Sequence, residues 1–496
     1  MDIYDLLDNS ETIQLKILRK IFSAGEKGVA CAEVRRSLKI NANTVLEAVG
    51  LFNDFFKETY VDRKVAINYT SETGLLTLDT EENIDFSEIY STFLRRSINY
   101  QIIQKVSFES SSISQLAVRL YLSEATIFRK IKLLNSKIEE FQLKIKNVKM
   151  HGDEIQIRYL LYSLTVNAYT FNQHLLKFQE RTHPFADAFI NTFEVLSNYK
   201  FSIQGKIKLR IWLDITIKRI RLLNDTSMDA NYLEVENQAL YKAIKTSFLS
   251  ILDHYSLLIG EDEIMILYSF MVSFELYDSK YLPLGTKEIN SNGKVALLDK
   301  EFLRRVHEVF PHYEEKVTIE TRREIEYSLT NLHCKITKFC GSFYYFSGKS
   351  ISHLANMEIY QRLLTISKKL VASIEESFSD FITAEVLSLV YRRYFNLLLE
   401  ILKNYSIKIR IGVSIHKDYS IKEGVFFRLT YLKHYFFDVE IEEAAEQQKY
   451  DLLITDLIVS TEQFAHDYYY LLTDIETTYD SDRIQKILVK IYKKKV

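Results

Sequence analysis

The sequence predicts a mainly α-helical, multidomain protein that ends in a small α/β domain. Only three prolines occur in 496 residues, so few helices are interrupted, and Leu, Ile, Lys and Glu recur at helical spacing along most of the chain. After about residue 404 this spacing gives way to short apolar strands. A chain of this length exceeds one hydrophobic core. We therefore expect five domains, at residues 1–85, 90–160, 165–282, 283–403 and 404–496.

The first two domains have the pattern of winged helix-turn-helix units. Residues 1–85 open with helical spacing and end in KVAINYTSETGLLTLDTE, which alternates apolar and polar residues around a glycine-containing turn, as a hairpin does. Residues 90–160 repeat this plan. Their helices are followed by LKIKNVKMHGDEIQIRYL, which predicts two strands around His151, Gly152 and Asp153. Two consecutive winged units are the simplest interpretation.

The rest of the chain predicts two helical domains and the α/β domain. The segment LPLGTKEINSNGK, residues 282–294, has the composition of a connection between the helical domains. Beyond residue 404, SIKIRIGVSI, FFDVEIE and YDLLITDLI predict strands, and IKEGVFFRLTYLKHY predicts a helix between the first two. This alternation favours a parallel sheet. The terminal KIYKKKV is expected to be a short, solvated basic tail.

Composition excludes several classes of protein. The formal net charge is -2, so any nucleic-acid surface must be local. Three cysteines provide neither a disulfide framework nor a four-ligand metal site and favour a reducing, cytoplasmic compartment. The N-terminus is acidic, unlike a signal peptide, and no apolar run of about 18 residues predicts a membrane span. Nucleotide-binding, zinc-protease and hydrolase motifs are absent from the sequence. We expect no enzyme, no cofactor and no metal.

The segment from Ile113 to Asn135, ISQLAVRLYLSEATIFRKIKLLN, predicts a helix-turn-helix. Ala117 allows two helices to approach closely, and Ser123 is a good N-cap for the second helix. Tyr121 stands where such a turn usually carries glycine, which predicts a strained turn. The expected inner face consists of Leu116, Leu120, Leu122, Ile127, Ile131 and Leu134.

The second helix of this segment carries the predicted DNA contacts. From Gln101 to His151 there are nine Lys or Arg and four acidic residues, so the local charge is 9 - 4 = +5. Phosphate binding needs such an excess. Basic residues on an amphipathic helix are also compatible with a merely solvated face. The predicted DNA-binding residues are Ser123, Thr126, Arg129, Lys130 and Lys132, with Glu124 beside them.

The first unit has the same layout but lacks the charge. Its second helix offers Asn41, Asn43 and Thr44 near the start, followed by Glu47 and Asp54. Residues 1–70 hold ten Lys or Arg and ten acidic residues. The unit is therefore either an auxiliary DNA contact or a structural module.

The whole layout resembles the Mga/AtxA group of Gram-positive virulence regulators. The resemblance is most specific in LYLSEATIFRKIKLLN, which is similar to the second DNA-binding module of that group. It implies that the helical domains are similar to phosphotransferase-system regulation domains (PRDs) and that the last domain is similar to a sugar-phosphotransferase EIIB subunit. It also implies a homo-oligomeric transcription activator that responds to carbohydrate status through a phosphotransferase-system phosphocarrier protein.

The resemblance also points to particular residues in these regulatory domains. In the first PRD-like domain, LDITIKRIR places Asp214 at the histidine position and Arg221 at the later basic position. In the second, LTNLHCKITKF places His333 at the phosphoacceptor position, with Lys338 after it. A neutral histidine is nucleophilic near pH 7, although a histidine with a structural role has the same pattern.

The EIIB-like domain is expected to be catalytically silent. An active EIIB carries a cysteine directly after its first strand, whereas here the strand IKIRIGVSI leads into Ser414, Ile415 and His416. His416 is an alternative phosphoacceptor in principle, and a surface loop histidine is the simpler interpretation.

These features together predict a cytoplasmic regulator of transcription that binds double-stranded DNA as a homodimer or higher homo-oligomer. Pairing raises the affinity of a short recognition helix for two half-sites. The alternatives are a phosphocarrier component of the phosphotransferase system and a scaffold protein that does not bind DNA.

Overall fold

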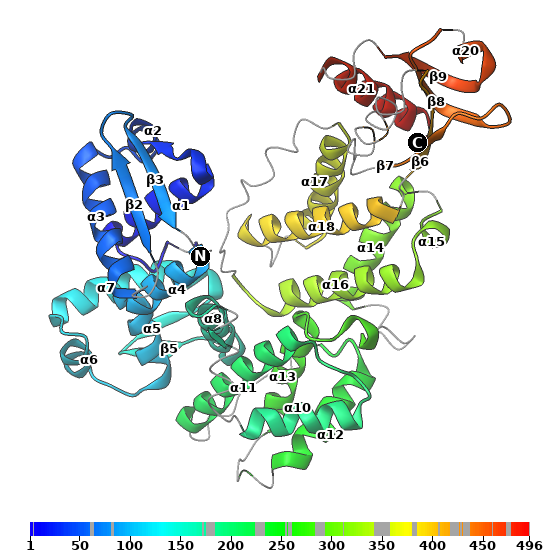
Figure 1. Cartoon of the computed structure of the whole chain (residues 1–496). Coiled ribbons are helices and arrows are strands. Elements are labelled where there is room, and N and C mark those ends of the chain that lie inside the picture. The colour runs from blue at the N-terminus through cyan, green and yellow to red at the C-terminus, as the bar shows by residue number, and fades with distance from the viewer. Residues whose placement is uncertain are drawn as a thin grey trace. The chain divides into compact units, whose positions relative to one another are not determined.

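The computed structural model (Figure 1) describes residues 1–2, 4–59, 64–80, 84–170, 173–174, 184–223, 234–252, 255, 260–282, 293–310, 312–341, 358–378, 384–404, 407–416, 426, 429, 437–458, 460–472 and 478–495. The chain is mostly helical, as predicted. It divides into two compact units. The first contains residues 1–301, 326–358 and 371–390, and the second contains residues 302–325, 359–370 and 391–496.

The N-terminal part of the first unit contains three main helices and a small sheet. Its elements are α1 (Asn9–Ala24), η1 (Gly25–Lys27), β1 (Val29–Ala30), α2 (Cys31–Leu38), α3 (Ala42–Thr59), β2 (Val65–Thr70) and β3 (Leu75–Thr80). The strands form an antiparallel sheet in the order β1-β3-β2. Asp8 and Glu11 form a capping box that starts α1. The hairpin predicted from KVAINYTSETGLLTLDTE is confirmed, with Val65 opposite Thr80.

The next part of the first unit likewise places an antiparallel hairpin after a set of helices. It comprises α4 (Phe86–Arg96), α5 (Ile98–Phe108), α6 (Ile113–Arg119), α7 (Glu124–Ile138), η2 (Glu139–Phe141), β4 (Lys144–Lys146), β5 (Lys149–His151) and α8 (Glu154–Ala168). β4 and β5 form a two-stranded antiparallel hairpin, which we call the wing. Lys146 lies opposite Lys149, so its turn consists of Asn147 and Val148, both with positive φ angles.

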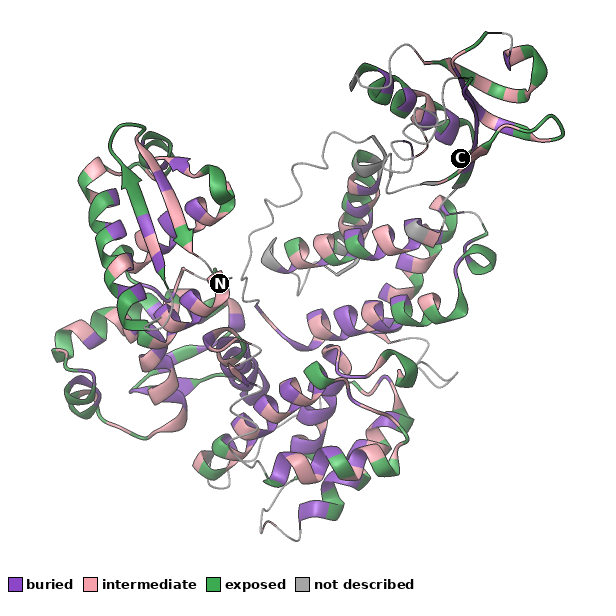
Figure 2. Ribbon diagram, viewed as in Figure 1, coloured by how far each residue is buried: buried purple, intermediate pink, exposed green. Residues whose placement is uncertain are grey.

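The prediction of two strands around His151, Gly152 and Asp153 is wrong in its second half. EIQIRYL forms the first turns of α8 rather than a strand, because Asp153 caps a helix by accepting a hydrogen bond from the Ile155 N–H. The alternating pattern misleads because α8 is buried on nearly all sides, including its charged residues Glu154 and Arg158. This burial is visible in Figure 2. α8 also continues through residues 160–165, where the sequence predicts a domain boundary.

Further helices of the first unit share one core with α8. They are α10 (Pro184–Leu196), α11 (Ile203–Leu223), α12 (Gln238–Leu252) and α13 (Glu261–Ser273), with η3 (Ser279–Tyr281) after them. Of these helices, α11 and α13 contact α8 directly. Trp212 stacks on Phe270 with ring centroids 4.2 Å apart. One hydrophobic cluster runs from Met1 to Phe339, so the winged segments and these helices are parts of a continuous core.

Four long helices contribute to both units. They are α14 (Lys294–Val309), α16 (Ile319–Lys338), α17 (Glu358–Phe378) and α18 (Ala384–Asn404), and the short α15 (Tyr313–Lys316) lies between the first two. The C-terminal end of α16 packs on α8, because Gln156 Nε2 donates to the Lys338 carbonyl and Tyr159 donates to the Gly341 carbonyl.

The C-terminal domain contains the parallel sheet that the sequence predicts. Strands β6 (Ile407–Ser414), β7 (Phe437–Glu443), β8 (Lys449–Thr455) and β9 (Ala465–Leu471) lie in the order β7-β6-β8-β9, and all pairs are parallel. The short α20 (Ser460–Gln463) precedes β9, and α21 (Thr478–Lys495) packs on the sheet. The basic tail is therefore not free in solvent, since Lys495 pairs with Asp451 at 2.6 Å.

Some predictions lie outside the described residues. They include nearly all of the connection at 282–294 and the helix expected in IKEGVFFRLTYLKHY. Within the described ranges, no helix combines the length and apolar character that a membrane span requires. The same residues contain no group of three or more His, Cys, Asp or Glu that could hold a metal ion.

Candidate nucleic-acid interface

The turn between α6 and α7 is built by the capping devices that the sequence suggests. α6 starts with a capping box between Ser112 and Gln115. It ends with the hydrogen-bond pattern of a Schellman motif, in which the Leu122 N–H donates to the Ala117 carbonyl at 3.0 Å and the Tyr121 N–H donates to the Val118 carbonyl at 3.2 Å.

Tyr121 occupies the left-handed position of this motif. Its φ angle is 55°, and its side chain is 94% exposed. The predicted strain is therefore present, because a side chain in this conformation costs about 1–2 kcal/mol relative to glycine. Ser123 then caps α7 by accepting a hydrogen bond from the Thr126 N–H, as predicted.

The inner face of the helix-turn-helix is confirmed. Ala117 is 4% exposed, and the tight contact between α6 and α7 depends on its small side chain. Of the predicted apolar residues, Leu116, Leu120, Ile127 and Leu134 are buried, and Leu122 and Ile131 are partly buried against the same core.

The opposite face of α7 is open to solvent. Arg129 and Lys132 are exposed near its centre, and Thr126 is half-buried at its edge, where its hydroxyl accepts a hydrogen bond from Arg129. Phe128, which the sequence analysis did not single out, is 59% exposed on this face. It directly follows the buried Ile127 and so lies about 100° away from the inner face around the helix, and this is the signal that identifies it.

Lys130 does not point outward as predicted. It is half-buried, and its amine lies 3.4 Å from Asn99 Oδ1 on α5. At 100° per residue, Lys130 is only about 60° from Ile127 around the helix, which explains this inward position. Lys130 therefore holds α7 against α5.

The wing contributes a basic face beside α7. Lys144, Lys146 and Lys149 are exposed, whereas Ile145 and Met150 point into the core. This alternation follows from the period of two in a strand.

One side chain ties the wing to α7. Asn135 on α7 accepts from the Ile145 N–H at 2.6 Å and donates to the Ile145 carbonyl at 3.0 Å. Asn135 lies on the same side of the helix as Phe128 and Lys132, so β4 runs along that side.

The structure separates the nine basic residues of this segment into two sets. Four are engaged within the protein: Lys105 and Arg119 pair with Glu109, Lys137 pairs with Asp5, and Lys130 contacts Asn99. The other five have no acidic partner among the described residues. We call these five the recognition surface: Arg129, Lys132, Lys144, Lys146 and Lys149.

The first winged segment, within residues 1–85, uses the same local devices as the segment that contains α6 and α7. Lys39 has a φ angle of 56° at the end of α2, two residues before Asn41, as Tyr121 stands two residues before Ser123. Asn41 accepts from the Thr44 N–H at 2.7 Å. Asn53 on α3 then binds both backbone groups of Ile67 on β2, at 2.7 and 3.0 Å, as Asn135 binds those of Ile145.

The exposed face of α3 differs in chemistry from that of α7. Asn41 and Asn43 are exposed at its start, and Thr44 is half-buried. Farther along, Leu51 is 52% exposed, and the exposed Glu47 adds negative charge. The exposed Asp54 pairs with Lys57 at 3.6 Å. The helix, turn and hairpin of the first winged segment thus match those of the second, whereas the charge on the exposed face of its second helix differs.

His333 lies in a buried polar contact on α16. Its side chain is fully buried, and Nδ1 lies 2.5 Å from Asp299 Oδ1 on α14. Thr330 donates to the other Asp299 oxygen at 2.7 Å. The contact with Asp299 and the full burial of the ring close His333 to a phosphocarrier, which needs an exposed ring. Phosphorylation at His333 therefore requires local opening of this contact.

The other residues named by the resemblance have ordinary partners. Asp214 forms an ion pair with Lys218 at 2.7 Å. Lys338 is buried and pairs with Glu236 at 2.7 Å. His416 follows β6, where its backbone N–H and Nδ1 both lie 3.1 Å from the Asp456 carboxylate. The adjacent Ser414 is buried and contacts the Ser460 hydroxyl.

An exposed second helix that follows a capped turn, with a basic hairpin tied to it, defines a DNA-binding protein of the helix-turn-helix class. Residues 82–165 match the Mga helix-turn-helix domain, which spans α4 to most of α8. The chain therefore carries a helix-turn-helix domain of the Mga type, and the resemblance predicted for LYLSEATIFRKIKLLN is confirmed.

Two regulators of Bacillus anthracis are similar to this chain. The capsule synthesis positive regulator AcpB is 23% identical over 209 residues, which cover 42% of this chain and 42% of that protein. The anthrax toxin expression trans-acting positive regulator is 25% identical over 188 residues, which cover 37% of this chain and 39% of that protein. The alignments thus span about two fifths of each relative.

Proposed function

We propose that this protein is a transcription activator that binds double-stranded DNA mainly through α7 and the wing. The recognition surface supports the proposal, because five cations that have no acidic partner in the described part of the chain gather on one helix and the hairpin tied to it. In a protein of net charge -2, this local excess favours phosphate binding. The similarity to two positive regulators supports activation rather than repression.

In this proposal α7 lies in the major groove. Arg129 is central on its exposed face and has the geometry to bind guanine, while Phe128 offers an apolar contact to a thymine methyl group. Lys132 and the three wing lysines contact phosphates. Ser123 and Thr126 stabilise the first turn of α7, and Lys130 fixes the helix to α5.

In this proposal residues 1–85 form an additional winged helix-turn-helix. The shared devices at Lys39, Asn41 and Asn53 support the fold, and the acidic residues on α3 support an auxiliary role. Asn41, Asn43 and Thr44 are its proposed DNA contacts. The C-terminal domain is EIIB-like and serves self-association into a homodimer, and the helical domains are PRD-like. A cytoplasmic location follows from this function.

Salt-dependent DNA binding tests the main proposal. The double variant Arg129→Ala/Lys132→Ala should weaken binding to a duplex library, and the slope of log K against log salt should become shallower by about 0.9 for each lost phosphate contact. Arg119→Gln is the matched control, since it removes one positive charge from the same domain but from a residue paired with Glu109. Fluorescence anisotropy at several salt concentrations measures the DNA affinity and its salt slope for each variant.

Two outcomes would contradict the proposal. Equal slopes for the double variant and the native chain would mean that α7 does not contact phosphates. A native chain without salt-dependent DNA affinity would favour the scaffold alternative. Transfer of phosphate from a phosphohistidine carrier onto sugar would favour a phosphocarrier component instead.

Regulation through phosphorylation of His333 is a separate proposal. A phosphocarrier protein should label the native chain and not the His333→Ala variant, and labelling should be faster in Asp299→Asn, because that substitution weakens the contact that buries the ring. Persistent labelling of His333→Ala would assign the phosphate to another residue. Sedimentation with and without DNA tests dimerisation, and a monomer under both conditions at micromolar concentration would exclude it.

A further inference from the structure

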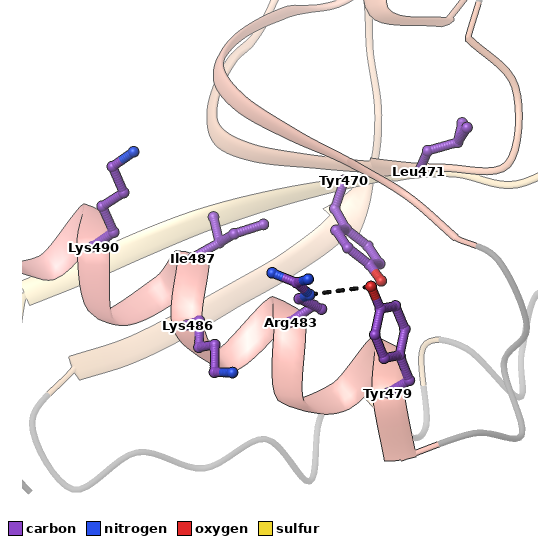
Figure 3. A pocket seen from close by; sticks show the side chains of 7 residues that line it. All are labelled: Tyr470, Leu471, Tyr479, Arg483, Lys486, Ile487 and Lys490. Carbon is purple, nitrogen blue, oxygen red and sulfur yellow. Dashed lines mark hydrogen bonds between the residues drawn. The ribbon is translucent and has the colours of Figure 1, made fainter.

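A cleft of about 450 Å³ lies between β9 and α21 in the C-terminal domain (Figure 3). Tyr470 and Leu471 on β9 form one wall. The other wall belongs to α21 and consists of Tyr479, Arg483, Lys486, Ile487 and Lys490. This volume is within the range of small-molecule sites, although the cleft is open to solvent on one side.

Three cations face this cleft without acidic partners among the described residues. Arg483, Lys486 and Lys490 are exposed and stand at positions i, i+3 and i+7 of α21, so they form one row about 10 Å long. Their described contacts are with aromatic groups. Arg483 donates to the Tyr479 hydroxyl at 3.2 Å, and the Lys490 amine lies 5.4 Å from the centre of the Tyr468 ring.

Two of the nearby acidic residues are engaged with other groups, and a third, Asp482, is exposed on α21 outside the lining of the cleft. Asp480 is 3% exposed and accepts a hydrogen bond from Tyr470 at 2.5 Å. Asp467 pairs with Lys449 at 2.7 Å. The described lining of the cleft holds three cations and no acidic residue, and Tyr470 and Tyr479 bring their hydroxyl groups close to Arg483, as Figure 3 shows.

We propose that this cleft binds a small molecule that carries a phosphoryl group. A guanidinium group binds phosphate oxygens through paired N–H donors, and the two lysines add positive charge along the row. The tyrosine rings provide apolar faces for the remainder of such a molecule. The concave shape favours a small ligand over duplex DNA, because DNA backbones are contacted by cations spread along an extended surface.

Isothermal titration of the full-length chain tests this proposal with three probes: inorganic phosphate, glucose 6-phosphate and glucose. Both phosphate-bearing probes should bind at one site per chain, and glucose should not. The variant Arg483→Gln/Lys486→Gln should weaken their binding about tenfold or more, since it removes two charge-assisted contacts. Lys493→Gln is the matched control, because it removes an exposed charge from the same helix outside the cleft.

Each result either identifies the kind of ligand or excludes the proposed binding site. Tighter binding of glucose 6-phosphate than of phosphate would assign a phosphate ester, and equal binding would assign the free anion. Equal weakening by Lys493→Gln, binding of glucose, or no saturation would overturn the proposal. Loss of duplex affinity in Arg483→Gln/Lys486→Gln would instead assign this row to DNA. The Arg129→Ala/Lys132→Ala variant should still bind inorganic phosphate and glucose 6-phosphate at the cleft. Failure of the DNA-binding proposal can therefore be told apart from failure of this one.

Discussion

A buried ionic cluster connects the DNA-binding segment to the helices that follow it. Arg158 on α8 is fully buried and donates to Glu154 at 2.9 Å and to both oxygens of Glu263 on α13, at 2.5 and 2.7 Å. Arg219 on α11 donates to both oxygens of Glu154, at 2.9 and 2.7 Å, and to the Ser107 carbonyl at the end of α5. Two arginines and two glutamates balance in charge, so each of these buried side chains has a partner of opposite charge.

The substitution Arg158→Met should destabilise the first unit by about 3–5 kcal/mol, because it leaves Glu263 buried without its partner. At about 2–4 °C per kcal/mol, the first thermal transition should fall by roughly 6–20 °C. The double variant Arg158→Met/Glu263→Met should regain most of this loss, since the remaining pair of Glu154 and Arg219 is balanced in charge.

Lys245→Met is the control for this prediction. Lys245 pairs with Glu261, two residues from Glu263 on the same helix, at 2.6 Å, but the two side chains are 39% and 56% exposed. The loss should therefore be less than about 1 kcal/mol. Thermal unfolding measures the size of each effect, and hydrogen exchange of the α8 amides locates it. A loss in Arg158→Met no larger than that in Lys245→Met would refute the reasoning.

Three further predictions follow from single residues. Tyr121→Gly should stabilise the Mga-type domain by about 1 kcal/mol, because glycine adopts the left-handed conformation without strain, and urea unfolding would show no gain if the turn is unstrained. Burial raises the pKa of the Cys334 and Cys340 thiols, so both should resist a thiol reagent at pH 8 until urea unfolds the chain, and fast labelling of the native chain would contradict this. A hydrogen bond from Lys245 lowers the pKa of Glu261, so its stabilisation is present above the ordinary value of 4.5 and is lost as the pH falls further. The difference between the native chain and Lys245→Met should shrink over that interval, and a constant difference would exclude the effect.

Local signals made the helix-turn-helix predictable from the sequence. The Ser123 cap, the small Ala117 and the apolar spacing each depend on residues a few positions apart, and the structure contains all three. Tyr121 was also identified locally, since its position in the turn requires a positive φ angle.

Features that depend on distant partners could not be predicted in this way. Nothing near His333 in the sequence indicates Asp299, which lies 34 residues earlier. The direction of Lys130 depends on Asn99, 31 residues away, although its place around the helix was available from the spacing. The basic C-terminus was misjudged because its lysines obscured an apolar stripe of Ile484, Leu488 and Ile491.

The position of Glu154 explains why the DNA-binding domain depends on the rest of the first unit. The wing ends at His151, Asp153 caps α8, and Glu154 binds one arginine from α8 and another from α11. A fragment that ended at residue 165 would keep Arg158 and lose both Glu263 and Arg219, and it would expose the apolar sides of α8. The helix that follows the wing is thus anchored by α11 and α13, which lie outside the Mga-type domain. The full chain is therefore the form in which DNA affinity has to be measured.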